Sequence, residues 1–184
     1  MLFFGEVQMK NYLQSIKNFD ASFLNWIQAH TRTDFMDRVM LFFSRLGDRG
    51  AIWIIYAVIC ACSARLRQVG MNLTMCVSAS AFLGNFAIKP IFRRTRPCNA
   101  DNTRSLLLAR PGDSSFPSCH TMTSFAAAVV TAWQAGGLMG VTSLVFASMI
   151  SFSRVYLYMH YPSDVLAGIA FGIVTGGIFI FSIA

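Results

Sequence analysis

The sequence predicts an all-α membrane protein: a polytopic bundle of five to six transmembrane helices, preceded by an amphipathic helix. Of its 184 residues, 55% are hydrophobic and 12% are charged, whereas an ordinary soluble domain has about 25% charged residues. Uncharged stretches of the length needed to cross a bilayer, about 20 residues, recur from residue 68 onward. The length suits one domain, 1–184, which we divide into an N-terminal segment, 1–33, and a helical bundle, 34–184.

The N-terminal segment predicts an amphipathic helix. Apolar side chains recur at steps of three or four residues, at Tyr12, Ile16, Phe19, Phe23 and Ile27, which places them on one helical face. Such a stripe is typical of a helix that lies on the membrane surface, and packing against the bundle is the alternative. The first residues lack a basic stretch followed by an apolar core, so we expect no cleavable signal peptide.

The next two segments are shorter. Phe35 to Leu46 is rich in Phe, Met and Leu but carries Asp37, Arg38 and Arg45. These charges leave two alternatives: a short span shielded by the other helices, or a helix at the membrane interface. A short apolar span follows from Gly50 to Ala64 and is closed by basic residues that suit the membrane interface.

Four longer spans are predicted from uncharged runs. Gln68 to Ile88 contains 21 residues without a charge. The 33 uncharged residues from Thr121 to Ser153 are interrupted by a glycine pair, which predicts two helices at about 115–135 and 138–158. Val165 to Ala184 forms the last span.

The order of these spans predicts that polar residues from three segments meet at one membrane face. Lys89 ends one span and the next begins near His120, so both lie on the same side. The following helix crosses the membrane and its successor returns, which brings Arg154 and His160 back to that side. Asp164 then opens the last helix there.

Three motifs occupy these segments. Residues 89–97 read KPIFRRTRP, residues 117–120 read PSCH, and residues 153–164 read SR, five residues, H, three residues, D. In this order they resemble the type 2 phosphatidic acid phosphatase superfamily, whose signature is KxxxxxxRP, PSGH and SRxxxxxHxxxD. Every specified position matches except Cys119, where the family usually has Gly. One such pattern alone is a weak match, but three in order on one membrane face are specific.

The residue types in the motifs suit phosphate chemistry. Phosphoryl transfer spreads negative charge over three oxygens, and Lys89, Arg96 and Arg154 would neutralise it. Ser118 and the backbone amide of Cys119 lie where a loop becomes a helix, a position that favours an anion. Two structural alternatives remain, a helix N-cap for Ser118 and a snorkelling anchor for Arg154. Cys119 adds bulk where a glycine would let the backbone approach the phosphate closely.

The resemblance implies that His160 is the nucleophile and forms a phosphohistidine. Asp164, four residues later, would orient the imidazole and stabilise its charged form, or would serve as a cap at the start of the last helix. His120 would act as the general acid and later activate water. No carboxylate cluster suited to magnesium appears near the motifs, so we expect no metal and no other cofactor.

The resemblance also implies a substrate. The short chain is similar to bacterial members that hydrolyse undecaprenyl diphosphate to undecaprenyl phosphate, with phosphatidylglycerol phosphate, phosphatidic acid and lipid A as alternatives. Vanadium haloperoxidases share the constellation but are generally larger and soluble, and a non-catalytic lipid-binding or transport protein would not need the full set of charged residues. The expected partners are a lipid phosphate and the bilayer, with no nucleic acid, and the sequence indicates no oligomeric state.

Two arguments oppose each other on membrane orientation. The positive-inside rule would place the basic loop in the cytoplasm. The resemblance implies an integral protein of the bacterial inner membrane with its active site on the periplasmic face, and we adopt this orientation. Cys98 and Cys119, in or beside that loop, could form a disulfide on an oxidising face, which the sequence does not establish.

Overall fold

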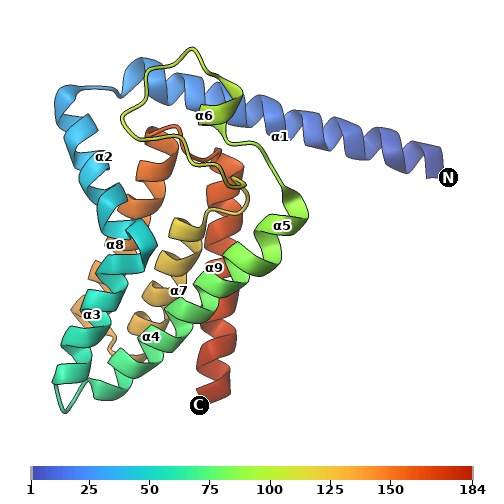
Figure 1. Cartoon of the computed structure of the whole chain (residues 1–184). Helices are drawn as coiled ribbons and strands as arrows, with labels where there is room; N and C mark the ends of the chain where they lie inside the picture. The colour runs from blue at the N-terminus through green and yellow to red at the C-terminus, as the bar shows by residue number, and fades with distance from the viewer. Residues whose placement is uncertain (1, 184) are drawn as a thin grey trace.

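The computed structural model describes residues 2–183, with side chains placed for residues 8–182, and every regular element within this range is helical. Long helices run side by side between the two ends of the molecule, and the N-terminal helix crosses them at one end (Figure 1). The all-α transmembrane bundle predicted from the sequence is therefore confirmed. The elements, in chain order, are α1 (Leu2–His30), α2 (Asp34–Gly47), η1 (Asp48–Gly50), α3 (Ala51–Cys62), α4 (Arg67–Phe82), η2 (Leu83–Ile88), α5 (Lys89–Phe92), α6 (Pro97–Ala100), α7 (Cys119–Gln134), α8 (Gly137–Tyr156) and α9 (Pro162–Ile183).

Helix α1 joins the bundle through its C-terminal part. Leu24 and Ile27 are buried, and Gln28 Nε2 donates a hydrogen bond to the Tyr156 carbonyl oxygen at 2.7 Å. The other members of the predicted apolar stripe are exposed, and the first half of α1 extends away from the bundle (Figure 1). Of the predicted apolar stripe, only Ile27 therefore packs against the bundle, and the side chains of its other members are exposed.

Helices α2 and α3 stack end to end and form one column of the bundle (Figure 1). They are separated by a kink in η1, where Arg49 and Gly50 adopt left-handed conformations with φ of 54° and 70°. The segment Phe35 to Leu46 therefore stacks on α3 and packs against α8. The charge of Asp37 is satisfied by the Tyr156 hydroxyl at 2.6 Å and by Arg32 at 3.0 Å.

Three segments among the described residues are long and apolar enough to cross a membrane: Arg67–Ala100, Gly137–Tyr156 and Pro162–Ser182. Helix α7 is shorter, with 16 residues, because the predicted start near residue 115 is a loop that enters the bundle before the helix begins. The last predicted span corresponds to α9, and Ala184, like Met1, lies outside the described residues.

Helix α7 occupies the centre of the bundle and packs against α4, α8 and α9. Its contact with α9 is close because α9 presents glycines at every fourth position. A Cβ atom at Gly172 would lie 2.5 Å from the Met122 carbonyl oxygen, and one at Gly168 would lie 2.8 Å from the Ser118 carbonyl oxygen. Small residues at this spacing allow membrane helices to pack backbone to backbone, which fixes the start of α7 against the start of α9.

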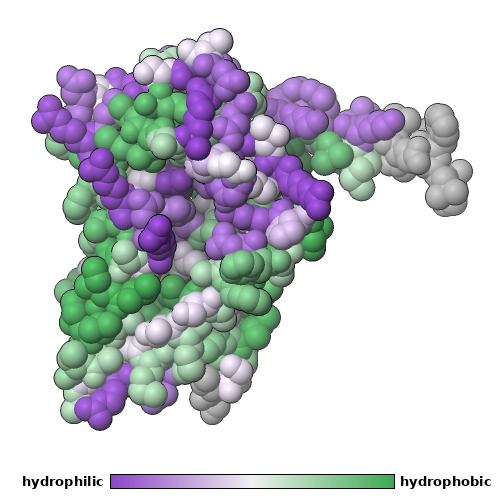
Figure 2. Space-filling model, in the orientation of Figure 1, coloured by the Kyte–Doolittle hydropathy of each residue, from purple (hydrophilic) through white to green (hydrophobic). Residues whose placement is uncertain are grey.

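Polar groups concentrate at one end of the molecule. Figure 2 shows hydrophobic surface over the lower part of the bundle and hydrophilic surface at the upper end, where α1, α6 and the loop before α7 lie. The end of α5, the start of α7, the end of α8 and the start of α9 all meet there (Figure 1). The convergence predicted from the order of the spans is therefore present.

Candidate active site

The three motifs line one cavity of about 630 Å³ at this polar end. Most of the predicted site residues line it, together with one carboxylate from the kink between α2 and α3: Asp48, Lys89, Arg96, Cys119, His120, Arg154 and His160. Asp164 is not among the lining residues. The three cationic side chains are all nearly buried, with 4–8% of their surface exposed. Buried cations require anionic or polar partners, so the partners of each define what the cavity can bind.

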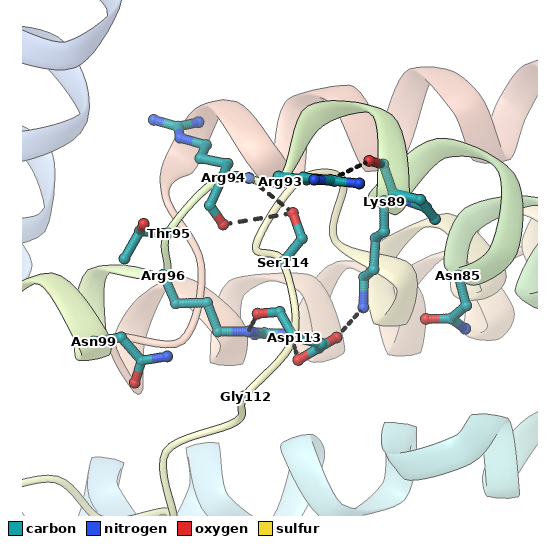
Figure 3. A pocket seen from close by; sticks show the side chains of 11 residues that line it. Asn85, Lys89, Arg93, Arg94, Thr95, Arg96, Asn99, Gly112, Asp113 and Ser114 are labelled. Carbon is teal, nitrogen blue, oxygen red and sulfur yellow. Dashed lines mark hydrogen bonds and ion pairs between the residues drawn. The ribbon is translucent and has the colours of Figure 1, made fainter.

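Lys89 and Arg96 share one carboxylate that the motifs did not reveal. Asp113 Oδ2 lies 2.5 Å from Lys89 Nζ, and Asp113 Oδ1 lies 2.8 Å from Arg96 Nη2. Figure 3 shows this carboxylate between the two cations. Burial would raise the pKa of Asp113, but the hydrogen bond from Lys89 and the charge of Arg96 hold it below its usual range. Asp113 is therefore an anion that pairs with two of the three cations predicted to bind phosphate.

Arg154 differs from the other two cations because no carboxylate among the described side chains pairs with it directly. Its Nη1 donates to the hydroxyl of Ser44, on α2. Its Nε is buried and has no hydrogen-bond partner among the described residues. A buried guanidinium with an unused donor at a cavity suits an anionic ligand better than the snorkelling anchor considered from the sequence.

His160 is held in one tautomer by its two neighbours. Its Nδ1 lies 2.7 Å from the Ser115 carbonyl oxygen, which can only accept, so Nδ1 carries the proton. Its Nε2 lies 3.0 Å from Arg96 Nη1, which can only donate, so Nε2 presents its lone pair. Burial lowers the pKa of His160 well below its ordinary value, and the charges of Arg96 and Arg154 lower it further. The imidazole is therefore neutral, with a nucleophilic nitrogen on the side of the cations.

Asp164 lies beside His160 but does not hydrogen-bond to it. Its Oδ2 is 3.7 Å from His160 Nδ1 and accepts a hydrogen bond from the Tyr161 amide at 2.9 Å. Its Oδ1 accepts from Arg94 Nη1 at 2.7 Å. The hydrogen bond that orients the imidazole thus comes from the Ser115 carbonyl oxygen and not from the Asp164 carboxylate. Asp164 instead accepts a hydrogen bond from the Tyr161 backbone amide at the start of α9.

His120 is paired with Asp48, the second carboxylate that the motifs did not contain. The distance from His120 Nε2 to Asp48 Oδ1 is 3.0 Å. The hydrogen bond from His120 lowers the pKa of Asp48, and burial opposes that shift. Asp48 lies in the α2–α3 kink, directly before the left-handed residues Arg49 and Gly50, and lines the cavity.

Comparison with known proteins agrees with this geometry. The model of the PAP2 superfamily matches residues 69–183, which is more than half of the chain and contains all three motifs. This chain belongs to the PAP2 superfamily. An undecaprenyl-diphosphatase of Sulfolobus acidocaldarius is 31% identical over 133 residues, which cover 72% of this chain and 64% of that protein.

Two solved structures share the PAP2 fold seen here. The PAP2 type phosphatidylglycerolphosphate phosphatase of Bacillus subtilis superposes with a TM-score of 0.74 at 19% identity, covering 91% of this chain and 86% of that one. LpxE of Aquifex aeolicus gives a TM-score of 0.74 at 23% identity, covering 88% and 94%. At these identities the likeness concerns the fold.

The PSCH motif departs from the usual PAP2 motif at Cys119, and the structure accommodates the larger side chain at a glycine. A Cβ atom at Gly84 would lie 2.8 Å from Cys119 Sγ, so the thiol fills the space beside that glycine. Cys98 and Cys119 are both free, and the disulfide considered from the sequence is not formed.

Ser118, which the sequence predicted to bind phosphate, is not among the residues that line the cavity. It is fully buried, and its Oγ accepts a hydrogen bond from Thr121 Oγ1 at 3.0 Å. It occupies the residue before α7 but makes no side-chain cap. Its backbone amide donates to the Asp164 carbonyl oxygen at 3.1 Å, so Ser118 joins the starts of α7 and α9.

Proposed function

We propose that this PAP2 protein hydrolyses a lipid phosphate or diphosphate without a metal ion, with His160 as the nucleophile. The tautomer of His160 supports this most strongly. A carbonyl oxygen 2.7 Å from Nδ1 fixes the proton there, which leaves the Nε2 lone pair on the side of Arg96. A neutral imidazole with its lone pair on Nε2, beside three buried cations, is the arrangement required for attack on phosphorus once Arg96 Nη1 turns from Nε2 to a phosphoryl oxygen.

In the first step, His160 Nε2 attacks phosphorus, and the bond from phosphorus to the leaving oxygen breaks as the N–P bond forms. The three cations of the cavity neutralise the charge on the phosphoryl oxygens. The backbone amide of Cys119, at the start of α7, adds a donor at a helix N-terminus. The positive charge that the ring acquires is stabilised by the Ser115 carbonyl oxygen at 2.7 Å and by Asp164 at 3.7 Å.

His120 is the proposed general acid. It gives a proton to the leaving oxygen in the first step and accepts one from water in the second. That water attacks phosphorus, the N–P bond breaks, and phosphate leaves. Asp48, 3.0 Å from His120 Nε2, favours the protonated imidazole that the first step needs.

We propose undecaprenyl diphosphate as the substrate and undecaprenyl phosphate as the lipid product. The name of the Sulfolobus relative supports this choice. Phosphatidylglycerol phosphate, phosphatidic acid and lipid A are the alternatives. We further propose that the protein resides in a bacterial inner membrane with its active site on the periplasmic face.

The function is tested by phosphate release from the detergent-solubilised protein in EDTA, with undecaprenyl diphosphate and phosphatidylglycerol phosphate compared directly. His160→Ala is the test variant. His30→Ala is the matched control, because His30 lies exposed at the end of α1 and its ring contacts only α1 in the hydrogen-bond network, through the Trp26 carbonyl oxygen. Release in EDTA that is lost in His160→Ala and kept in His30→Ala supports the proposal.

Two outcomes contradict it. Release that depends on an added divalent metal would refute the metal-independent chemistry. Equal release from His160→Ala and the wild type, with both proteins monodisperse, would refute the assignment of the nucleophile.

A further inference from the structure

Arg94 connects two buried carboxylates from opposite ends of the chain. Its Nη2 lies 2.6 Å from Asp20 Oδ2, and its Nη1 lies 2.7 Å from Asp164 Oδ1. The side chains of Asp20 and Asp164 are 1% and 0% exposed, and the guanidinium stacks on the Tyr161 ring at 4.1 Å. Each carboxylate therefore depends on Arg94 as its cationic partner.

The backbone of Arg94 holds the other contact of the nucleophile. The Ser115 amide donates to the Arg94 carbonyl oxygen at 2.8 Å, and the Ser115 carbonyl oxygen accepts from His160 Nδ1 at 2.7 Å. Arg94 thus reaches His160 by two routes, through Asp164 with its side chain and through Ser115 with its backbone. A shift of Arg94 would move both groups that surround the Nδ1 side of the imidazole.

Asp20 is the only member of this network that comes from α1 among the described residues. Besides Arg94, it accepts hydrogen bonds from the Ser163 amide at 2.9 Å and from the Ser163 hydroxyl at 2.6 Å. Ser163 precedes Asp164 in the first turn of α9. Asp20 therefore fixes both the guanidinium that Asp164 binds and the backbone that carries Asp164.

We propose that Asp20 is a positioning residue for catalysis, which acts through Arg94 to hold Asp164 and the His160 imidazole in place. This proposal rests on the proposed function of His160. It makes α1 part of the catalytic machinery, although none of the described side chains of α1 lines the cavity.

A role as a simple attachment point for α1 does not account for the Asp20 contacts. The helix is already held by buried Leu24 and Ile27 and by the hydrogen bond from Gln28 to the Tyr156 carbonyl oxygen. An attachment point does not need a charged group that is 1% exposed, because burying a carboxylate is costly unless its charge is used. Gln28 therefore offers a matched control: it ties α1 to the bundle and does not touch Arg94.

The test compares Asp20→Asn and Gln28→Ala, each in the wild-type and in an Asp164→Asn background. We expect Asp20→Asn to lower kcat by about tenfold with KM nearly unchanged, because it disturbs groups behind the nucleophile and not the cations that bind phosphate. We expect Gln28→Ala to keep kcat within about twofold of the wild type. In the Asp164→Asn background, Asp20→Asn should add no further loss, since residues that act through one another are not additive.

A second readout does not require activity. Hydrogen–deuterium exchange reports on the Tyr161 amide, which donates to Asp164, and on the Ser115 amide, which donates to Arg94. Asp20→Asn should speed exchange in the peptides that contain these amides, and Gln28→Ala should not.

Either of two results would overturn the proposal: equal effects of Asp20→Asn and Gln28→Ala on both readouts, or an undiminished loss of kcat from Asp20→Asn in the Asp164→Asn background. A wild-type protein that releases no phosphate, together with the expected exchange difference, would refute the proposed function and leave the positioning network in place.

Discussion

Asp113 should compete with the phosphate group for the cations of the active site. It contacts Lys89 and Arg96 at 2.5 and 2.8 Å, and it lines both the catalytic cavity and a neighbouring cavity of similar volume. An anion that binds Lys89 and Arg96 must share or replace these contacts. We therefore expect Asp113→Asn, which keeps the shape and removes the charge, to tighten the binding of tetrahedral anions.

The magnitude follows from the two contacts. A hydrogen bond between charged groups contributes about 1.5–3 kcal/mol when buried. The Asp113 side chain is 49% exposed, so solvent screening reduces each contact to roughly 0.5–1 kcal/mol. Loss of the competing charge should then strengthen anion binding by about 1–2 kcal/mol in total, which is roughly 5- to 30-fold.

The assay is inhibition of the enzyme by orthovanadate and by inorganic phosphate, at low and at high salt. The inhibition constants of Asp113→Asn should fall by that factor, and the gain should shrink as salt rises. Weaker inhibition in Asp113→Asn would refute the reasoning, because it would show that Asp113 holds Lys89 and Arg96 in their binding positions. Asp101→Asn is the control, since Asp101 pairs with Arg104 in the same loop and away from the cavity lining.

Three further predictions concern the histidines and the altered motif. The folded protein has a lowered pKa at His160, whereas a histidine in the unfolded chain has a pKa of about 6.5. The neutral His160 ring therefore contributes its full stability above about pH 6.5, and this contribution is lost as the pH falls below that value. The wild type should lose thermal stability between about pH 7 and 5 more steeply than His160→Gln, and equal slopes in the two proteins would contradict this. Asp48→Asn should move the alkaline limb of the kcat profile to lower pH, because the protonated form of His120 loses its carboxylate, and an unmoved limb would count against their pairing. Gly84→Ala should lower the melting temperature and the activity, because the added Cβ atom would lie 2.8 Å from the Cys119 thiol. Adding Cys119→Gly should restore both properties, and failure of that rescue would show that the clash lies elsewhere.

The sequence predicted the parts of the site that depend on motif spacing and on the order of the spans. Uncharged runs and their alternation between membrane faces were sufficient to bring Lys89, His120, Arg154 and His160 to one end of a helical bundle. The structure confirms this convergence. Each of these residues lies at or near the end of a helix, so the order of the spans determines which face of the membrane it reaches.

The partners of these residues were not predictable in the same way. Asp48 and Asp113 lie outside the motifs, in a helix kink and a loop, and only the left-handed backbone of η1 and the path of the loop turn them toward the cavity. The contact that orients His160 comes from a backbone carbonyl oxygen, that of Ser115, and every residue type has one. The pairing of Asp20 with Arg94 joins residues 74 positions apart, which no local pattern indicates.

The continuity of α2 with α3 was also hidden from hydropathy. The charges of α2 left a short span and an interfacial helix as alternatives. One of these charges, Asp37, is satisfied by Tyr156, which is distant in sequence. A window of composition does not contain that information, because it depends on which helix packs alongside.

The central claim is that a phosphoryl group is transferred to His160 Nε2, and the most direct test is to trap that intermediate. The wild type and His120→Ala would be mixed with lipid diphosphate carrying labelled phosphate in EDTA, quenched in base within milliseconds to seconds, digested and analysed by mass spectrometry. The account predicts a base-stable, acid-labile phosphate on the peptide that contains His160, absent from His160→Ala. Rapid phosphate release by the wild type with no label on that peptide at any quench time would contradict it and indicate direct attack by water.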